Sequence, residues 1–200
     1  MNAYVFQSLA ERGKAEGMDP NRTKEARDWY RTNAQQIRSV NTSRLMTDKK
    51  NIKTVINQRD IGKMFMFFYD PKHKDTLPYY DTFPLVFPID FKPGGFLGIN
   101  LHYLPPVLRA RLMDALYATA NNRKYDDSTK LRVSYQILAS ASRFKYFKPC
   151  IKHYLWEHVM GNRYLNIEPT NWDSALMLPT ERFKKATKDK VWRESKEIAG

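Results

Sequence analysis

The feature that most constrains the fold is the apolar run MFMFFY at residues 64–69. A continuous apolar and aromatic run that ends at Asp70 and Pro71 is typical of a strand buried on both faces. The segments before it are polar and basic, so the main core is expected to begin at this run.

The next two apolar segments predict an antiparallel hairpin. TFPLVFPIDF (82–91) and FLGINLHYL (96–104) are joined by Lys92-Pro93-Gly94-Gly95, whose glycines can adopt the positive φ of a tight turn. Pro84 and Pro88 have no amide hydrogen to donate to a neighbouring strand. We therefore expect their strand to lie at a sheet edge or to follow an irregular extended path.

The second half of the chain is predicted to add helices, a short strand and a docked tail. After Pro105-Pro106, the residues Val107, Leu108 and Leu112 follow helical spacing, and arginines are expected on the opposite side. The later predictions are a helix from Asp127 or Ser128 to about Ser142, a helix from Pro149 to Met160, a strand at RYLNIEP, a short helix at NWDSALML, and a tail docked through Phe183, Val191 and Trp192.

Residues 1–60 are predicted to form a basic N-terminal helical arm, and residues 61–200 an α+β core domain with the docked tail. Asp19-Pro20 is a helix start signal, and the unbroken sequence after it predicts a helix to about Ser39. A polar loop and a short helical stretch at 52–58 should follow. The predicted fold class is α+β: a small antiparallel sheet that could close into a barrel, packed with several helices.

Charge restricts the partners. The formal net charge is +13, and residues 1–60 and 121–160 hold most of the excess of Lys and Arg over Asp and Glu. A surface of this sign attracts phosphate polymers, anionic membranes or acidic protein faces. No apolar run approaches the roughly 18 residues that span a bilayer, so we expect no membrane insertion. One cysteine, Cys150, cannot form an intramolecular disulfide and favours a reducing compartment.

No catalytic, cofactor or metal motif is present in the sequence. His153 and His158 are five positions apart on an expected helix, which places them on different faces. Cys150 has no recognisable histidine partner and is expected to be a small buried apolar residue, with His102 a core histidine and His73 a solvated one. Asp70, Asp75, Asp81 and Asp90 are interpreted as turn formers and ion-pair partners, and a metal-dependent nuclease is the least favoured hypothesis. We therefore predict a protein that is not an enzyme and has no cofactor.

The segment SRFKYFKPCIKHY (142–154) carries the strongest local signal, because cations that neutralise phosphates alternate with rings that stack on bases. The alternative is that the rings belong to the core and only the cations face outward. A second basic cluster follows the expected N-terminal helix. The candidate DNA-binding residues are Arg143, Lys145, Lys148, Lys152, Phe144 and Tyr146 in the first segment, and Arg44, Lys49, Lys50 and Lys53 in the second.

Three blocks carry a resemblance to a known family: residues 61–117 (IGKMFMFFYD to LMDALY), SASRFKYFKPCIKHYL and WDSALMLPTERF. They resemble virion structural proteins of T-even-type tailed bacteriophages, and most of all the family of DNA end protectors. The resemblance implies a head protein that binds the ends of double-stranded DNA and blocks nucleases. It also implies a location in the virion, synthesis in the host cytoplasm, contacts with other phage structural proteins, and assembly as a homo-oligomeric ring. A tail, neck or baseplate subunit that acts only through acidic protein surfaces is the alternative. No functional residues are carried over from the family.

Overall fold

Strand β2 (Met64–Met66) lies inside the main sheet because its side chains have apolar partners on both faces. The protein is described by a computed structural model, in which residues 4–18, 23–120, 135–140 and 145–199 are placed. Met64 and Met66 belong to the large apolar cluster on one face of the sheet, whereas Phe65 and Phe67 belong to an aromatic cluster on the other. The predicted doubly buried strand is therefore confirmed.

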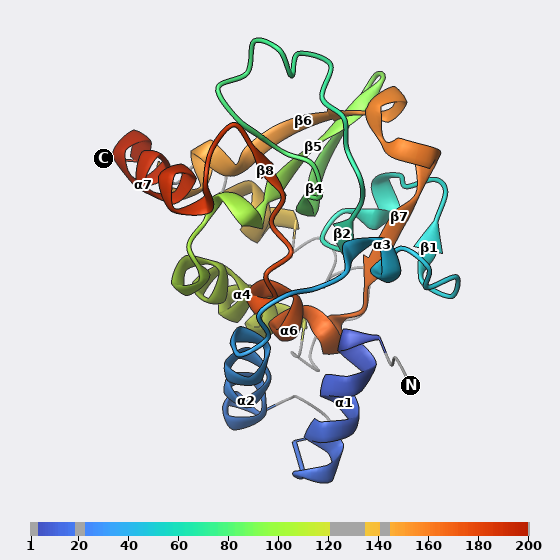
Figure 1. Cartoon of the computed structure of the whole chain (residues 1–200), viewed down its shortest axis with the longest axis vertical. Helices are drawn as coiled ribbons and strands as arrows, with labels where there is room; N and C mark the ends of the chain where they lie inside the picture. The colour runs from blue at the N-terminus through green and yellow to red at the C-terminus, as the bar shows by residue number, and fades with distance from the viewer. Residues whose placement is uncertain (1–3, 19–22, 121–134, 141–144, 200) are drawn as a thin grey trace.

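The main sheet is antiparallel, and in the described part of the chain it has six strands in the order β1-β7-β2-β4-β5-β6 (Figure 1). Its strands are β1 (Ile52–Lys53), β2, β4 (Leu85–Lys92), β5 (Gly95–Asn100), β6 (Ile151–Leu155) and β7 (Tyr164–Ile167), and a second sheet pairs β3 (Tyr80–Asp81) with β8 (Phe183–Lys184). The α+β class is confirmed. Because β1 and β6 are separate edges, the main sheet is open, and the described residues form no closed barrel.

The predicted hairpin is confirmed as β4 and β5, with Gly94 at φ +79° in the turn. Of the two alternatives for its first strand, the edge position is wrong, because β4 lies between β2 and β5, and the irregular path is confirmed by a register shift at Pro88. Strand β2 is short, and the β4 residues that it pairs with are Leu85 and Val86. Pro88 therefore lies beyond the β2–β4 ladder. The register with β5 also shifts between Pro88 and Asp90. The proline is therefore accommodated without interrupting a ladder with β2.

Residues 151–155 form strand β6 rather than the predicted helix. This strand pairs with β5 along its whole length, from Ile99↔Ile151 to Gly95↔Leu155. The pairing gives the backbone of β5 a second partner and places Tyr154 in the aromatic cluster. The two strands approach so closely that a Cβ atom on Gly95 would lie 2.0 Å from the Tyr154 carbonyl oxygen.

The N-terminal region differs from its prediction at two places. Helix α2 (Lys24–Gln35) is capped by the Thr23 side chain, which accepts a hydrogen bond from the Ala26 amide, and it ends before Ser39. Residues 19–22, where the helix was expected to begin, lie outside the described residues. The short helix predicted at 52–58 is wrong, because β1 pairs there with β7. The division of the chain near residue 60 stays a prediction.

The helices gather mainly on the methionine side of the sheet, where α2 and α4 pack against α6 (Figure 1). The helices are α1 (Val5–Ala15), α2, α3 (Thr42–Leu45), α4 (Pro106–Ala120), α6 (Trp172–Met177) and α7 (Lys188–Ala199), with short 3-10 segments at 58–60, 101–103, 145–150, 156–158, 160–162 and 169–171. Residues 135–140 are also helical; the rest of the helix predicted from 127 to 142 lies outside the described residues. The strand at RYLNIEP and the helix at NWDSALML are confirmed. No described helix is long and apolar enough to cross a membrane.

Helix α4 is confirmed, but its orientation differs from the expected stripe. Val107 is 63% exposed, whereas Arg109 is 1% exposed. The Arg109 guanidinium donates hydrogen bonds to the carbonyls of Leu104 and Leu176 and forms a 2.6 Å ion pair with Glu181. A buried guanidinium with this many acceptors holds the C-terminal segment against α4, which apolar spacing alone does not predict.

The C-terminal tail docks as predicted. Val191 is fully buried in the large apolar cluster, and the Trp192 indole donates a 2.8 Å hydrogen bond to the His102 carbonyl. Phe183 packs on the same cluster, with its ring edge-on to Tyr103 at 5.1 Å. The docked tail therefore packs against the residues that follow the hairpin, His102 and Tyr103.

Candidate nucleic-acid interface

The first predicted DNA-binding segment is divided between the surface and the core. Tyr146 and Lys148 are exposed, whereas Phe147 packs on the large apolar cluster and Tyr154 is buried in the aromatic one. Lys145 is the first residue of a 3-10 segment (Lys145–Cys150). The structure describes the backbone of Lys145 but not its side chain. Arg143 and Phe144 lie outside the described residues. The core interpretation therefore holds for Phe147 and Tyr154, although the helix assumed for their spacing does not form.

Lys152 is the unusual member of this segment, because it is a half-buried cation on edge strand β6. Its Nζ atom lies 4.1 Å from the centroid of the Tyr103 ring. Within the described residues no carboxylate forms an ion pair with it. Burial lowers the pKa of Lys152, and the neighbouring Cys150 acts in the opposite direction with a smaller effect. The side chain is a partly desolvated ammonium group with a ring, but no carboxylate, as its described partner.

Lys152 lines a cavity of about 370 Å³ between β6 and the loop that follows β2. We call this cavity the tyrosine pocket. Its lining residues are Tyr69, Pro71, Lys72, His73, Leu77, Tyr79, Tyr80, Asp81, Asn100, Tyr103, Lys152, His153, Tyr154 and Leu155. Lys72, His73 and His153 are exposed at its rim, and Tyr79 and Tyr80 are half-buried, so part of each ring is accessible to a ligand.

One wall of the tyrosine pocket, the loop from Pro71 to Tyr79, is fixed by a lysine from the C-terminal segment. Lys185 Nζ donates hydrogen bonds to the carbonyl oxygens of Lys74, Asp75 and Leu77, at 2.6, 3.1 and 3.1 Å. Pairing of β3 with β8 anchors the end of the loop, which lies beside β8 in Figure 1. The wall is therefore held in place before any ligand arrives.

The floor of the pocket is a buried polar network centred on Asp81. The Asp81 carboxylate pairs with His102 Nδ1 at 2.6 Å and accepts hydrogen bonds from the Asn100 side chain and from the amides of Phe83 and Arg182. Burial opposes ionisation of Asp81, but these partners together hold its pKa below the usual value. The expectation that His102 is a core histidine with satisfied hydrogen bonds is confirmed.

His102 Nε2 also lies 3.0 Å from the Thr180 hydroxyl, so Asp81, His102 and Thr180 follow the order of a nucleophilic triad. Thr180 and His102 are both 0% exposed, which leaves no path for a substrate to the hydroxyl. The arrangement is therefore structural: it ties the C-terminal segment to the hairpin.

The structure also explains the positions of Cys150, His73, Asp70 and Asp90. Cys150 is buried as predicted, and burial raises the pKa of its thiol to about 12. His73 is exposed, and Asp70 and Asp90 form ion pairs with Lys74 and Lys92. Among the described residues, no group of three or more His, Cys, Asp or Glu side chains is arranged to hold a metal ion.

The second predicted set lies near the opposite edge of the sheet, on α3, β1 and the turn between them. Lys49 is exposed, Lys50 lies 3.8 Å from Glu168, and Lys53 forms a 2.5 Å ion pair with the buried Asp60. The two predicted sets are therefore on separate elements, and two lysines of the second already have acidic partners.

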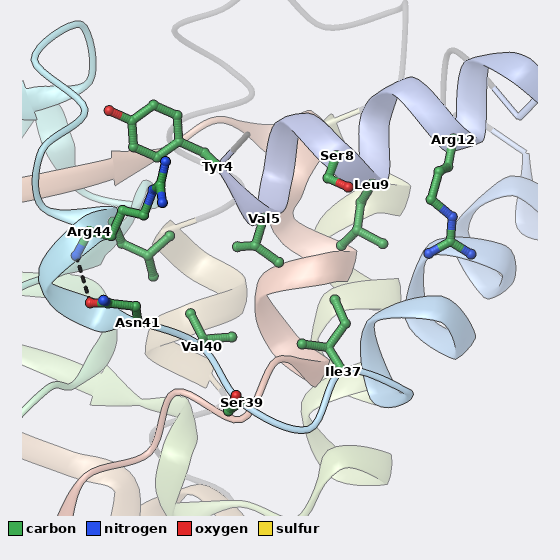
Figure 2. A pocket seen from close by; sticks show the side chains of 11 residues that line it. Tyr4, Val5, Ser8, Leu9, Arg12, Ile37, Ser39, Val40, Asn41 and Arg44 are labelled. Carbon is green, nitrogen blue, oxygen red and sulfur yellow. Dashed lines mark hydrogen bonds between the residues drawn. The ribbon is translucent and has the colours of Figure 1, made fainter. Parts of the chain in front are cut away.

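Arg44, the remaining member of the second set, lines a cavity of about 330 Å³ under α1. Its guanidinium lies 5.7 Å from the centroid of the Tyr4 ring. Figure 2 shows Arg44 and Arg12 at opposite ends of this cavity, with Val5 and Leu9 among the apolar side chains between them. The cavity is mainly apolar between these two cations, and it lacks the cluster of rings found in the tyrosine pocket.

The tyrosine pocket was not predicted from the sequence. Its rim comes from the segment DPKHKDTLPYY, which contains no residue of the two predicted DNA-binding sets. The available signal was the combination of lysine, histidine and paired tyrosines in that segment, the same mixture of cations and rings that marked residues 142–154.

Comparison with known families identifies a related family. The model of a family described as the phage T4 terminal DNA protecting protein matches residues 9–196. No curated protein and no solved structure matches the chain.

Proposed function

This chain belongs to the family of phage T4 terminal DNA protecting proteins, and from that premise we propose that it binds the ends of double-stranded DNA and shields them from exonucleases. In this proposal it acts as a non-enzymatic structural component of the virion, made in the host cytoplasm. The family description supports protection of DNA ends; contact with DNA is our inference.

The observation that carries the proposal is the position of Lys152 in the tyrosine pocket. A partly desolvated cation that has no carboxylate partner in the described part of the chain gains a charge-assisted hydrogen bond when a phosphate reaches it. Lys72 at the rim and Lys148 just before β6 are exposed and can add contacts to the DNA backbone. Arg143 and Lys145 complete the proposed set of phosphate contacts.

The first test compares binding to linear and to covalently closed DNA of the same sequence, at low and at near-physiological salt, with magnesium present and product length checked. We expect a preference for linear DNA that persists at the higher salt, without cleavage, and protection of the linear DNA from an added exonuclease. Equal binding that vanishes with salt would contradict the proposal and favour a tail, neck or baseplate subunit that acts through protein contacts. Magnesium-dependent cleavage would favour a nuclease.

The second test locates the contacts. Replacing Arg143, Lys145, Lys148 and Lys152 with Ala should lower the slope of log K against log salt by up to about 0.9 for each phosphate that is no longer neutralised. A charge-matched control replaces four exposed cations outside both predicted sets, Lys14, Arg111, Arg193 and Lys196. An unchanged slope in the first variant, or an equal reduction in the control, would exclude this segment as the site.

A further inference from the structure

We propose that the tyrosine pocket receives one unpaired nucleotide from the end of a DNA strand, which gives the protein its preference for ends. This inference rests on the proposed function and specifies the ligand of the same surface. It is drawn from the size of the pocket, its aromatic rings, its positive charge, and the hydrogen bonds that already occupy the polar groups of its floor.

The size of the pocket selects a single nucleotide. A volume of about 370 Å³ is near the lower end of the roughly 300–1,000 Å³ of pockets that enclose a small ligand. A base with its sugar and phosphate is a ligand of this kind, whereas a DNA duplex is too wide to enter. The duplex must therefore remain outside, against the exposed cations, while one nucleotide enters.

The walls of the pocket suit a base. Tyr79 and Tyr80 are half-buried, and the Tyr79 ring lies 6.2 Å from the Tyr103 ring with an interplanar angle of 36°. Tyrosine rings stack on any base, because every base has a π-face. Lys152, whose Nζ atom lies 4.1 Å from the centroid of the Tyr103 ring, and Lys72 at the rim supply the positive charge for the phosphate of the same nucleotide.

The floor of the pocket cannot select among bases. Both oxygens of the Asp81 carboxylate already accept hydrogen bonds or pair with His102, and the Asn100 side-chain oxygen accepts one from the His102 amide. The one carboxylate in the lining is the same Asp81, and these contacts already occupy both of its oxygens. Recognition should therefore depend on stacking and charge and should tolerate any terminal sequence.

An end is where a nucleotide becomes available at the lowest cost. Extruding a paired and stacked nucleotide costs a few kcal/mol, and the cost is smallest for a mismatched or already unpaired one. A terminal nucleotide has one stacking neighbour instead of two, so its extrusion costs less than that of an internal nucleotide. A fully paired circular duplex offers no nucleotide of this kind.

The experiment uses the full-length protein and linear duplexes with 4-thiothymidine either at the terminal position or several pairs inside. We expect ultraviolet cross-links from the terminal position to residues of the tyrosine pocket, mapped by mass spectrometry, and none from the internal position. A terminal mismatch should tighten binding about fivefold or more, because the pairing cost is removed. This gain should not depend on the identity of the mismatched bases.

Two matched variants test the ring itself. Tyr80→Leu removes the ring and should weaken end binding about 5- to 150-fold, the range of one base stack, whereas Tyr80→Phe keeps the ring and should bind like the wild type. If Tyr80→Leu disturbs β3, Leu77→Trp fills the pocket instead and should abolish the mismatch effect with an unchanged melting temperature. If linear DNA is still preferred but mismatches have no effect and cross-links fall elsewhere, this inference fails while the proposed function stands. Loss of the linear preference itself would refute the proposed function.

Discussion

Replacing Lys152 with Met should move DNA binding and folding stability in opposite directions. Methionine keeps the length and apolar stem of lysine and removes only the charge. In the free protein the Tyr103 ring stabilises that charge by roughly 0.5–2 kcal/mol, whereas burial of the ammonium group lowers the pKa of Lys152. We expect the cost of desolvating the charge to be larger than the gain from the ring. Removing the charge should therefore raise the free energy of unfolding, by about 0.5–1 kcal/mol.

The stability gain corresponds to a rise in melting temperature of about 1–4 °C for a chain of this length. The decrease in binding should be larger, because a hydrogen bond to a charged group contributes about 1.5–3 kcal/mol, or roughly 10- to 150-fold in affinity for linear DNA. Thermal denaturation and a DNA titration at near-physiological salt measure the two effects. Lys14→Met, at an exposed cation on α1, is the control and should change neither by much.

A Lys152→Met protein that is less stable and binds DNA as tightly as the wild type would refute this reasoning. It would mean that the ammonium group serves the fold through its contact with Tyr103. A protein that loses both stability and binding would show that the pocket collapses without the charge, and Lys152→Arg would then be expected to restore both.

Three further predictions concern the fold around the pocket. Asp81→Asn should cost about 3–5 kcal/mol at neutral pH, because it breaks the buried pairing of the Asp81 carboxylate with His102 Nδ1. Since the Asp81 pKa is held below the usual 3.8, this stabilisation is present above that pH and is lost as pH falls through the folded-state value, so urea titrations of wild type and variant should converge in acid; a constant difference would contradict the pairing. Gly95→Ala should cost about 1–3 kcal/mol, because the new Cβ would lie 2.0 Å from the Tyr154 carbonyl oxygen, and an unchanged melting temperature would contradict that close approach. Cys150 should react with a thiol reagent only after denaturation, because burial keeps its thiol protonated at neutral pH, and rapid labelling of the native protein would show that it is accessible.

The central sheet could be predicted because its signals are local. The run at residues 64–69 and the glycine turn at 94–95 each determine the conformation of a few neighbouring residues, and the structure follows both. Strand β6 could not be predicted in the same way, since the spacing of Phe147, Ile151 and Tyr154 also fits a helix. Only the open edge of β5 selects the extended form. The same holds for Arg109, whose burial depends on carbonyl groups and on Glu181, which are distant in sequence.

The candidate site could be predicted only in part. Lys152 was among the proposed contacts, but its pocket joins an edge strand to a turn that lies far from it in the sequence. No local pattern shows that these two segments meet. The rings of Tyr79 and Tyr80 were therefore missed, although the residues around them carry the same mixture of cations and aromatics.

The Lys185 contacts have a consequence for the order in which the protein matures. Every residue that lines the tyrosine pocket precedes position 156, but the ammonium group that holds its wall belongs to Lys185, which comes later in the chain. During synthesis the residues that line the pocket therefore leave the ribosome before Lys185 does. A nascent or clipped chain that lacks Lys185 would carry all the rings of the pocket without the contacts that hold its wall, so we expect only a chain that includes Lys185 to bind a DNA end.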